Sequence, residues 1–184
     1  TPGSRNSRCL ASRGTGRALP DLVGSGTVAC NEDSVTSVVF PVIVKPIFGS
    51  SSSYVVKIEN KGHFLKVYKK ILANLSLEVE PALEDGKELI VEEYIDGQEV
   101  DLDILFQNGE MKFISITDNN KTCEPFFIET GAIIPSQLNK IKQADLVNMA
   151  AKTLKSLKIK NGCFHFEAKS SSKGPVPIEL NQRI

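Results

Sequence analysis

Hydrophobic residues are sparse over the first 37 positions of the chain and then become dense. Residues 1–37 are rich in Ser, Gly, Arg and Thr, and their few apolar side chains follow neither a helical nor a strand period. We therefore expect this segment to be disordered or outside any domain. An apolar run at 38–44, rich in β-branched residues, is typical of a buried strand. The folded part of the chain is predicted to begin with that strand.

Short apolar runs and two helical patterns follow one another through the rest of the chain. Ser136, after Pro135, is expected to cap the second helix, and Asn108-Gly109 accepts the positive φ angles of a tight hairpin turn. The mixture of elements, joined mostly by antiparallel hairpins, predicts an α+β fold. Apolar spacing predicts strands at 54–58, 88–95, 99–106, 111–117, 163–168 and 176–180, helices over 64–72 and 138–157, and loops at 119–130 and 169–175.

Composition and charge narrow the class of protein further. The chain has 184 residues, of which 41% are hydrophobic and 24% charged, as in a soluble globular protein with one sizeable core. Lys plus Arg and Asp plus Glu both number 22, so no overall basic field recruits nucleic acid or acidic membranes. No apolar run reaches the roughly 18 residues of a membrane span, and the amino terminus lacks the apolar core of a secretory signal. We expect a cytoplasmic protein that binds neither nucleic acid nor membranes.

A group of polar residues near the carboxyl end is the first candidate for chemistry. Side chains two positions apart on a strand face the same way, so Glu179, Asn181 and Arg183 are predicted to project from one face. If Glu167 pairs across onto that face, three oxygen ligands converge beside a guanidinium. Carboxylate and amide oxygens suit Mg²⁺, and an arginine stabilises a developing anion. The alternative is a pair of solvated strands with scattered polar residues.

The order and spacing of motifs from Phe40 onward resemble the ATP-grasp superfamily. The strand 41–46 and the serine-rich stretch 49–53 resemble the phosphate-binding lysine and mobile lid loop of that family. The resemblance implies that Lys45 neutralises nucleotide phosphate while the loop offers backbone N–H groups and hydroxyls. Taken singly, a lysine after a strand is usually a surface residue and a serine run a flexible link. The loop residues implied in cofactor binding are Gly49, Ser50, Ser51 and Ser52.

The segment 91–99 resembles the hinge of the family, whose backbone reads adenine as a strand edge would. By this resemblance Glu93 and Ile95 contribute main-chain groups to adenine, and Glu92 contributes its carboxylate. Glu99 falls where many members of the family hold the ribose hydroxyls. The alternative for this acidic cluster is an exposed strand end.

The separation of Glu167 and Glu179 by 12 positions is similar to that in the biotin carboxylase branch, in which both carboxylates bind magnesium. The resemblance implies that Asn181 completes the metal site. It also implies that Arg183 stabilises the phosphorylated intermediate or the transferred phosphoryl group. The surrounding sequence is most similar to the amino-acid ligase branch, which includes carnosine synthase and bacterial dipeptide-forming L-amino-acid ligases.

Residues 129–136 resemble a segment that helps to form the amino-acid pocket in that branch. The resemblance implies that Glu129 receives the ammonium group of the substrate, whereas the alternative is a loop glutamate before a helix start. His165 alternates with phenylalanines and fits a hydrogen-bonded residue of the sheet. Substrate specificity is expected to lie in loops such as 122–136.

The resemblance implies an ATP-grasp fold of two α+β subdomains with antiparallel sheets that grip the nucleotide. The folded region 38–184 would then divide into a lid subdomain at 38–91 and a carboxy-terminal subdomain at 92–184. Residues 1–37 lack the pattern of the amino-terminal α/β domain of a complete enzyme, and the chain ends where relatives usually continue. We therefore expect an incomplete, truncated form of this fold.

The implied activity is that of an ATP-dependent carboxylate-amine ligase that forms ADP. ATP would phosphorylate a small carboxylate or amino-acid substrate, and an amine would attack the acyl phosphate. Magnesium, as one or two ions or replaced by Mn²⁺, would offset phosphate charge together with the catalytic residues Lys45 and Arg183. Two alternatives stay open: a catalytically inactive nucleotide-binding fragment that associates with a full-length relative, and a structural protein without a ligand.

Overall fold

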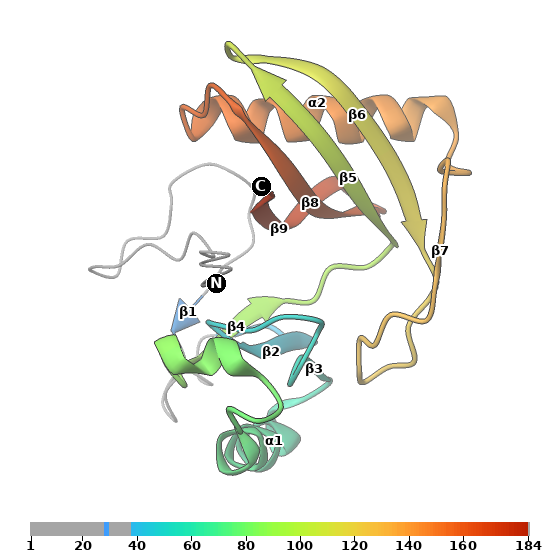
Figure 1. Ribbon diagram of the computed structural model, residues 1–184. Helices are drawn as coiled ribbons and strands as arrows, with labels where there is room; N and C mark the ends of the chain where they lie inside the picture. The colour runs from blue at the N-terminus through green and yellow to red at the C-terminus, as the bar shows by residue number, and fades with distance from the viewer. Residues whose placement is uncertain (1–27, 30–37, 184) are drawn as a thin grey trace. The chain divides into compact units, whose positions relative to one another are not determined.

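The computed structural model describes residues 28–29 and 38–183, which fold into two compact units (Figure 1). The amino-terminal unit contains the described residues up to Tyr94 together with Thr122–Thr130, and the carboxy-terminal unit contains Ile95–Lys121 and residues 131–183. The first division between the units falls after Tyr94, and the subdomain boundary expected after residue 91 stays a prediction. Apart from Val28–Ala29, the segment predicted to be disordered lies outside the described residues.

The amino-terminal unit is an antiparallel sheet with strand order β1-β4-β2-β3, and α1 packs against it. Alternate residues of β2 are buried, so Val42 and Val44 pack in one core with Phe64 and Ile71 of the helix. The strand begins later than expected because Pro41 has no N–H to donate to a ladder. The elements are β1 (Val28–Ala29), β2 (Val42–Pro46), β3 (Val56–Ile58), α1 (Lys61–Asn74), the 3-10 helix η2 (Pro81–Asp85) and β4 (Leu89–Glu93).

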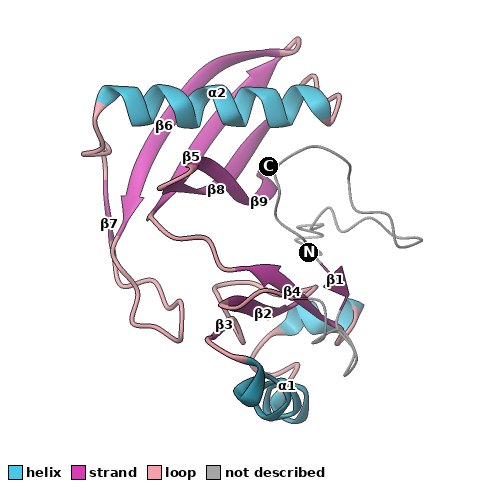
Figure 2. Ribbon diagram, turned by 180° about the vertical axis from the view of Figure 1, so that it is seen from behind, coloured by secondary structure: helices cyan, strands magenta, loops and turns pink. Residues whose placement is uncertain are grey.

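The carboxy-terminal unit is an antiparallel sheet with strand order β7-β6-β5-β8-β9, and α2 runs along one of its faces (Figure 2). Leu102 and Ile104 of β5 and Phe166 of β8 pack against Leu146 and Leu154 of the helix. Because side chains alternate along each strand, the opposite face carries the intervening polar residues. The elements are β5 (Gln98–Gln107), β6 (Glu110–Asn119), β7 (Ala132–Ile133), α2 (Lys140–Ser156), β8 (Gly162–Ser171) and β9 (Gly174–Arg183).

The two hairpins of this sheet test the turn predictions. Asn108 and Gly109 join β5 to β6 with φ angles of 52° and 77°, so the predicted tight turn is confirmed. The predicted loop at 169–175 is wrong, because the ladder of β8 and β9 continues to the pair Ser171 and Gly174. Serine, lysine and glycine suggest a loop by composition, but pairing with the neighbouring strand holds most of this stretch extended.

The predicted start of α2 is also wrong. The helix begins at Lys140, and Asn139 caps it by accepting a hydrogen bond of 2.9 Å from the Lys142 N–H. Ser136 instead accepts from the Leu138 N–H at 3.2 Å, within the turn that precedes the helix. Serine and asparagine cap helices about equally well, so position relative to the buried face decides between them. In the part of the chain that the structure describes, neither α1 nor α2 has the length and apolar character needed to cross a membrane.

Candidate functional site

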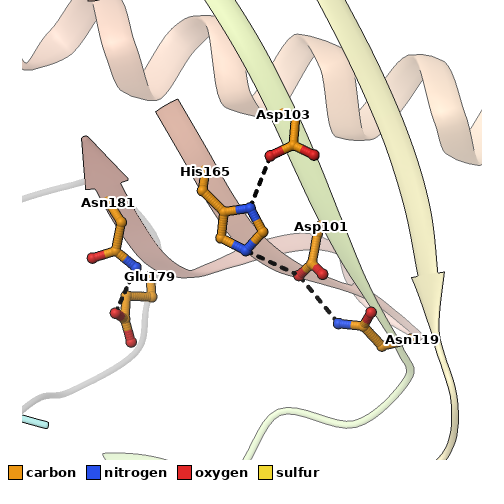
Figure 3. Close-up of polar contacts among 6 residues, drawn as sticks. All are labelled: Asp101, Asp103, Asn119, His165, Glu179 and Asn181. Carbon is orange, nitrogen blue, oxygen red and sulfur yellow. Dashed lines mark hydrogen bonds and ion pairs between the residues drawn. The ribbon is translucent and has the colours of Figure 1, made fainter. Parts of the chain in front are cut away.

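The pairing of β8 and β9 brings the predicted metal ligands onto one face of the carboxy-terminal sheet. Glu167 lies directly opposite Glu179, and His165 lies opposite Asn181. Residues that face each other across a ladder project from the same side, so Glu167 lies on this face, which is the condition that the magnesium hypothesis set. The Asn181 side-chain amide donates to Glu179 Oε1 at 2.8 Å (Figure 3). Arg183 is on the same face, two residues further along β9 and opposite Cys163.

The neighbouring strand β5 adds carboxylates that the sequence did not single out. Asp101 lies opposite Glu167, and Asp103 lies opposite His165. His165 Nδ1 is 2.9 Å from Asp103 Oδ1, and Nε2 is 3.8 Å from Asp101 Oδ1 (Figure 3). The Asn119 side-chain amide donates to the same Asp101 oxygen at 3.1 Å. The expectation that His165 is a bonded sheet residue is met, and this chain of contacts runs across three strands of the sheet.

This arrangement leaves excess negative charge around Glu167. Burial and the nearby carboxylates of Glu179 and Asp101 together raise the pKa of Glu167 to about 7, against the opposing effect of His165. Burial also raises the pKa of Asp101, although its hydrogen bond from Asn119 acts in the opposite direction. A divalent cation would offset this charge, and carboxylate and amide oxygens are suitable ligands for Mg²⁺.

Among the described residues, no group of three or more His, Cys, Asp or Glu side chains is placed to hold a metal ion by itself. A magnesium site on this face would therefore combine two carboxylates, Glu167 and Glu179, with the amide of Asn181. Magnesium commonly keeps several waters and completes its shell with substrate phosphates, so this small protein contribution fits the ion.

The predicted phosphate lysine is on β2 of the amino-terminal unit. Lys45 Nζ is 2.7 Å from Glu92 Oε2 on the neighbouring β4, and both side chains are at least three-quarters buried. Lys45, expected to bind phosphate, and Glu92, expected to bind adenine, therefore form an ion pair with each other. Glu93 is the last residue of β4, and Ile95 is the first residue of the carboxy-terminal unit. Glu99, the candidate for the ribose hydroxyls, lies on β5 with Oε2 3.5 Å from Lys169 Nζ.

The serine-rich loop contains a tight turn. The Ser53 N–H donates to the Ser50 carbonyl at 3.0 Å, and the two residues between them, Ser51 and Ser52, have φ angles of 51° and 55°. Ser50 also donates from its N–H and its hydroxyl to the buried carboxylate of Glu80, which the sequence did not indicate. Glu80 lies in a segment of ordinary polar composition, so nothing in its local sequence signals burial.

The segment Thr122–Thr130 is held on the amino-terminal unit, although both of its neighbours in sequence belong to the other unit. The Lys57 N–H donates to the Pro125 carbonyl at 2.9 Å, and Lys57 Nζ is 2.8 Å from Glu124 Oε2. The Tyr94 hydroxyl donates to Glu124 Oε1 at 2.6 Å, and Lys57 Nζ lies 4.0 Å from the centre of the Tyr94 ring. Glu129, the candidate substrate residue, is exposed on this segment.

We expect Lys57→Met to lower the free energy of unfolding by about 1–2 kcal/mol, because it removes the ion pairs of Lys57 with Glu124 and Glu59. Burial of Lys57 lowers its pKa, but hydrogen bonds to Glu124 and Glu59 more than offset this and raise it well above its usual range. The variant should also be cleaved faster by protease within Thr122–Thr130. Urea unfolding and mass-spectrometric mapping of the cuts measure both effects.

Lys112→Met is the matched control for this prediction, because Lys112 pairs with Glu110 at an exposed site. An exposed ion pair contributes little to stability, so this variant should unfold and be cleaved like the wild type. Equal behaviour of Lys57→Met and Lys112→Met would contradict the role of Lys57 in holding the segment.

The two antiparallel α+β units carry the candidate residues separately: Lys45 is in the amino-terminal unit, and the acidic face is in the carboxy-terminal unit. Residues 38–184 match the family model for the ATP-grasp domain, and the chain therefore belongs to the ATP-grasp family. The family and the fold class expected from the sequence are both confirmed. The match begins at the position where the apolar strand pattern begins.

Curated relatives include ligases of the branch that the sequence resembles. Carnosine synthase 1 of Gallus gallus is 30% identical over 151 residues, which cover 80% of this chain and 16% of that protein. The ATP-grasp enzyme fsqD of Aspergillus fumigatus is 31% identical over 155 residues, which cover 79% of this chain and 25% of that protein. This chain thus spans at most a quarter of the length of these two relatives.

Solved structures show the same fold at lower identity. The L-amino acid ligase from Bacillus licheniformis has a TM-score of 0.68 at 22% identity, over 87% of this chain and 36% of that one. The D-alanine–D-alanine ligase from Bacillus anthracis, solved in complex with ATP, has a TM-score of 0.58 at 19% identity, over 85% of this chain and 47% of that one. These likenesses establish the fold.

Proposed function

We propose that this chain binds ATP with Mg²⁺ and provides the ligase chemistry of a carboxylate-amine ligase. The observation that carries the proposal is the pairing of Glu167 with Glu179, beside Asn181, on the polar face of the carboxy-terminal sheet. Membership of the ATP-grasp family supports it, as does the presence of carnosine synthase and L-amino acid ligase among the similar proteins.

In this proposal Glu167, Glu179 and the Asn181 amide hold Mg²⁺. One or two ions are compatible with the donor set, and Mn²⁺ accepts the same oxygen ligands. When bound, the ion offsets the negative charge of the phosphates during transfer. Arg183, on the same face, adds a fixed positive charge for the phosphoryl group.

In the amino-terminal unit, Lys45 provides the cation for nucleotide phosphate. Its ion pair with Glu92 fixes the long lysine side chain, which lowers the entropy cost of presenting the ammonium group. Backbone N–H groups of the loop at Gly49 contribute further donors. The assignments for the rest of the ligands stay proposals from the resemblance: main-chain groups of Glu93 and Ile95 for adenine, Glu99 for ribose, and Glu129 for the substrate ammonium.

The proposed reaction has two steps. A carboxylate oxygen of the substrate attacks the γ-phosphorus of ATP, the bond to the β-phosphate oxygen breaks, and ADP leaves. An amine then attacks the acyl carbon, phosphate leaves, and the amine loses a proton to give the amide. Protein groups act here by holding the reactants and offsetting charge, which is the main source of catalysis in phosphoryl transfer.

Thermal unfolding with nucleotide tests the proposal. A ligand that binds only the folded protein raises stability by about 2.7 kcal/mol at a concentration of one hundred times Kd. We expect ATP, or a non-hydrolysable analogue, to raise the melting temperature in the presence of Mg²⁺ and not with EDTA. A cooperatively unfolding sample with no shift would exclude nucleotide binding.

Release of ADP separates the ligase from the alternative function. A ligase releases ADP and phosphate only when a suitable acid and amine are both present, so pairs of amino acids are the first substrates to screen. A shift in melting temperature without ADP release from any pair favours the alternative, a nucleotide-binding but inactive chain that acts by association with a full-length relative.

A further inference from the structure

Glu80 is a buried carboxylate whose hydrogen bonds go to the serine-rich loop. It is 2% exposed and lies just before η2. Its Oε2 accepts from the Ser50 N–H at 2.8 Å and from the Ser50 hydroxyl at 2.9 Å, while Oε1 accepts from the Ala82 N–H at 3.0 Å. Burying a carboxylate is costly unless its oxygens are bonded, so these three contacts keep it in place.

The loop that Glu80 holds has an unfavourable backbone. Residues 50–53 are all serine, yet the turn closed by Ser50 and Ser53 requires positive φ at both central residues. Glycine adopts such angles freely, whereas a residue with a Cβ adopts them at a cost. The turn therefore needs an external contact to favour it over other conformations. The two bonds from Ser50 to Glu80 supply that contact at the first residue of the turn.

The hydrogen bonds to Glu80 also determine which N–H groups of the loop are available to a ligand. Ser50 uses both its N–H and its hydroxyl on Glu80, so it is not free to contact a phosphate in this conformation. Within the described residues, the N–H groups of Ser51 and Ser52 donate no hydrogen bond. Successive backbone N–H groups in turns of this kind bind anions.

We infer that Glu80 is a positioning residue for nucleotide phosphate: it anchors Ser50 and thereby holds the turn whose Ser51 and Ser52 N–H groups face the ligand. This inference rests on the proposed ATP binding. It reassigns Ser50, expected from the sequence to bind phosphate, to an anchoring role. Glu80 is not a catalytic residue, because it acts only through the loop.

The test compares Glu80→Gln with the wild type by titration calorimetry with Mg²⁺ and a non-hydrolysable ATP analogue. Glutamine keeps the size of the side chain but replaces one oxygen by an NH₂ group, so it cannot accept from both Ser50 and the Ala82 N–H, and it carries no charge. We expect Kd to rise about tenfold, in line with the loss of a charge-assisted hydrogen bond. Amide hydrogen exchange at residues 50–55 should become faster in the nucleotide-free variant.

Leu83→Ala is the matched control, because Leu83 is a buried residue of η2 without a bond to the loop. It should lower the melting temperature but leave Kd for the folded protein and exchange in the loop unchanged. Ser51→Gly with Ser52→Gly, added to Glu80→Gln, should recover part of the lost affinity because glycine relieves the cost of positive φ.

The outcomes are separable. Failure of the wild type to bind nucleotide would refute the proposed function, whereas wild-type binding with an unchanged or lower Kd in Glu80→Gln would refute the anchoring role alone. If Glu80→Gln does not fold, Ser50→Ala takes its place, because it removes one of the two bonds from the loop side. Faster exchange at residues 51–54 of nucleotide-free Ser50→Ala supports anchoring, and unchanged exchange refutes it.

Discussion

Glu179→Ala is expected to remove the stabilisation of the protein by Mg²⁺ and ATP, with at least a hundredfold loss of affinity. Glu179 lies opposite Glu167 and accepts the hydrogen bond of Asn181, so its removal deletes one proposed ligand and releases another. Loss of a carboxylate ligand from a divalent ion also leaves the phosphate charge without its counter-ion. The shift in melting temperature and a direct titration with the ATP analogue measure the effect.

Glu110→Ala provides the control for this prediction. Glu110 is an exposed carboxylate on β6 of the same sheet, where it pairs with Lys112. Its removal changes the net charge by the same amount but takes away none of the proposed metal ligands, so nucleotide binding should stay at the wild-type level. Magnesium-dependent ATP binding retained by Glu179→Ala would count directly against the metal assignment.

On the polar face, the residues that belong to one strand or one hairpin could be predicted from the sequence. The period of two along a strand places Glu179, Asn181 and Arg183 together whatever the rest of the fold does. The sequence did not decide which residue lies opposite Glu179, and the observed register places Glu167 there. Local periodicity and one short connection thus account for the whole predicted metal set.

Asp101 and Asp103 could not be placed in the same way. The alternation of β5 shows that they share a face, but the strand that brings His165 and Glu167 beside them is β8, which follows only after β6, β7 and α2. Pairing between strands so far apart in sequence depends on the packing of the whole unit and is absent from any local pattern. The network around His165 therefore emerges only from the sheet order.

Glu80 and Lys57 were missed for a different reason. Charged residues are mostly exposed, so sequence reasoning assigns them to the surface unless a motif indicates otherwise. Here their burial is offset by specific partners distant in the chain: Ser50 for Glu80, and Glu124 with Tyr94 for Lys57. Neither partner lies at a spacing that a strand or helix period would detect.

Glu167→Gln is expected to make the nucleotide-free protein more stable at pH 8, by about 3 kcal/mol. The pKa of Glu167 in the folded protein is about 7, raised from 4.5, so the folded state holds this proton more tightly than the unfolded state. The contribution is fully present below pH 4.5 and is lost as the pH rises towards 7. The wild type should therefore lose stability across this window and stay at the lower level above it, as urea unfolding at several pH values would show.

Glutamine carries no charge at any pH, so the free energy of unfolding of the variant should not fall across this window. It should be closest to that of the wild type below pH 4.5. Glu110→Gln is the control, because Lys112 holds the pKa of that exposed carboxyl below its usual range and its removal offers no gain at pH 8. If the free energy of unfolding of the wild type and of Glu167→Gln changed with pH in the same way, the raised pKa of Glu167 on this face would be contradicted. A gain in stability at Glu167, combined with a loss of magnesium-dependent ATP binding, would show that the carboxylate is kept for its ligand at the expense of the empty fold.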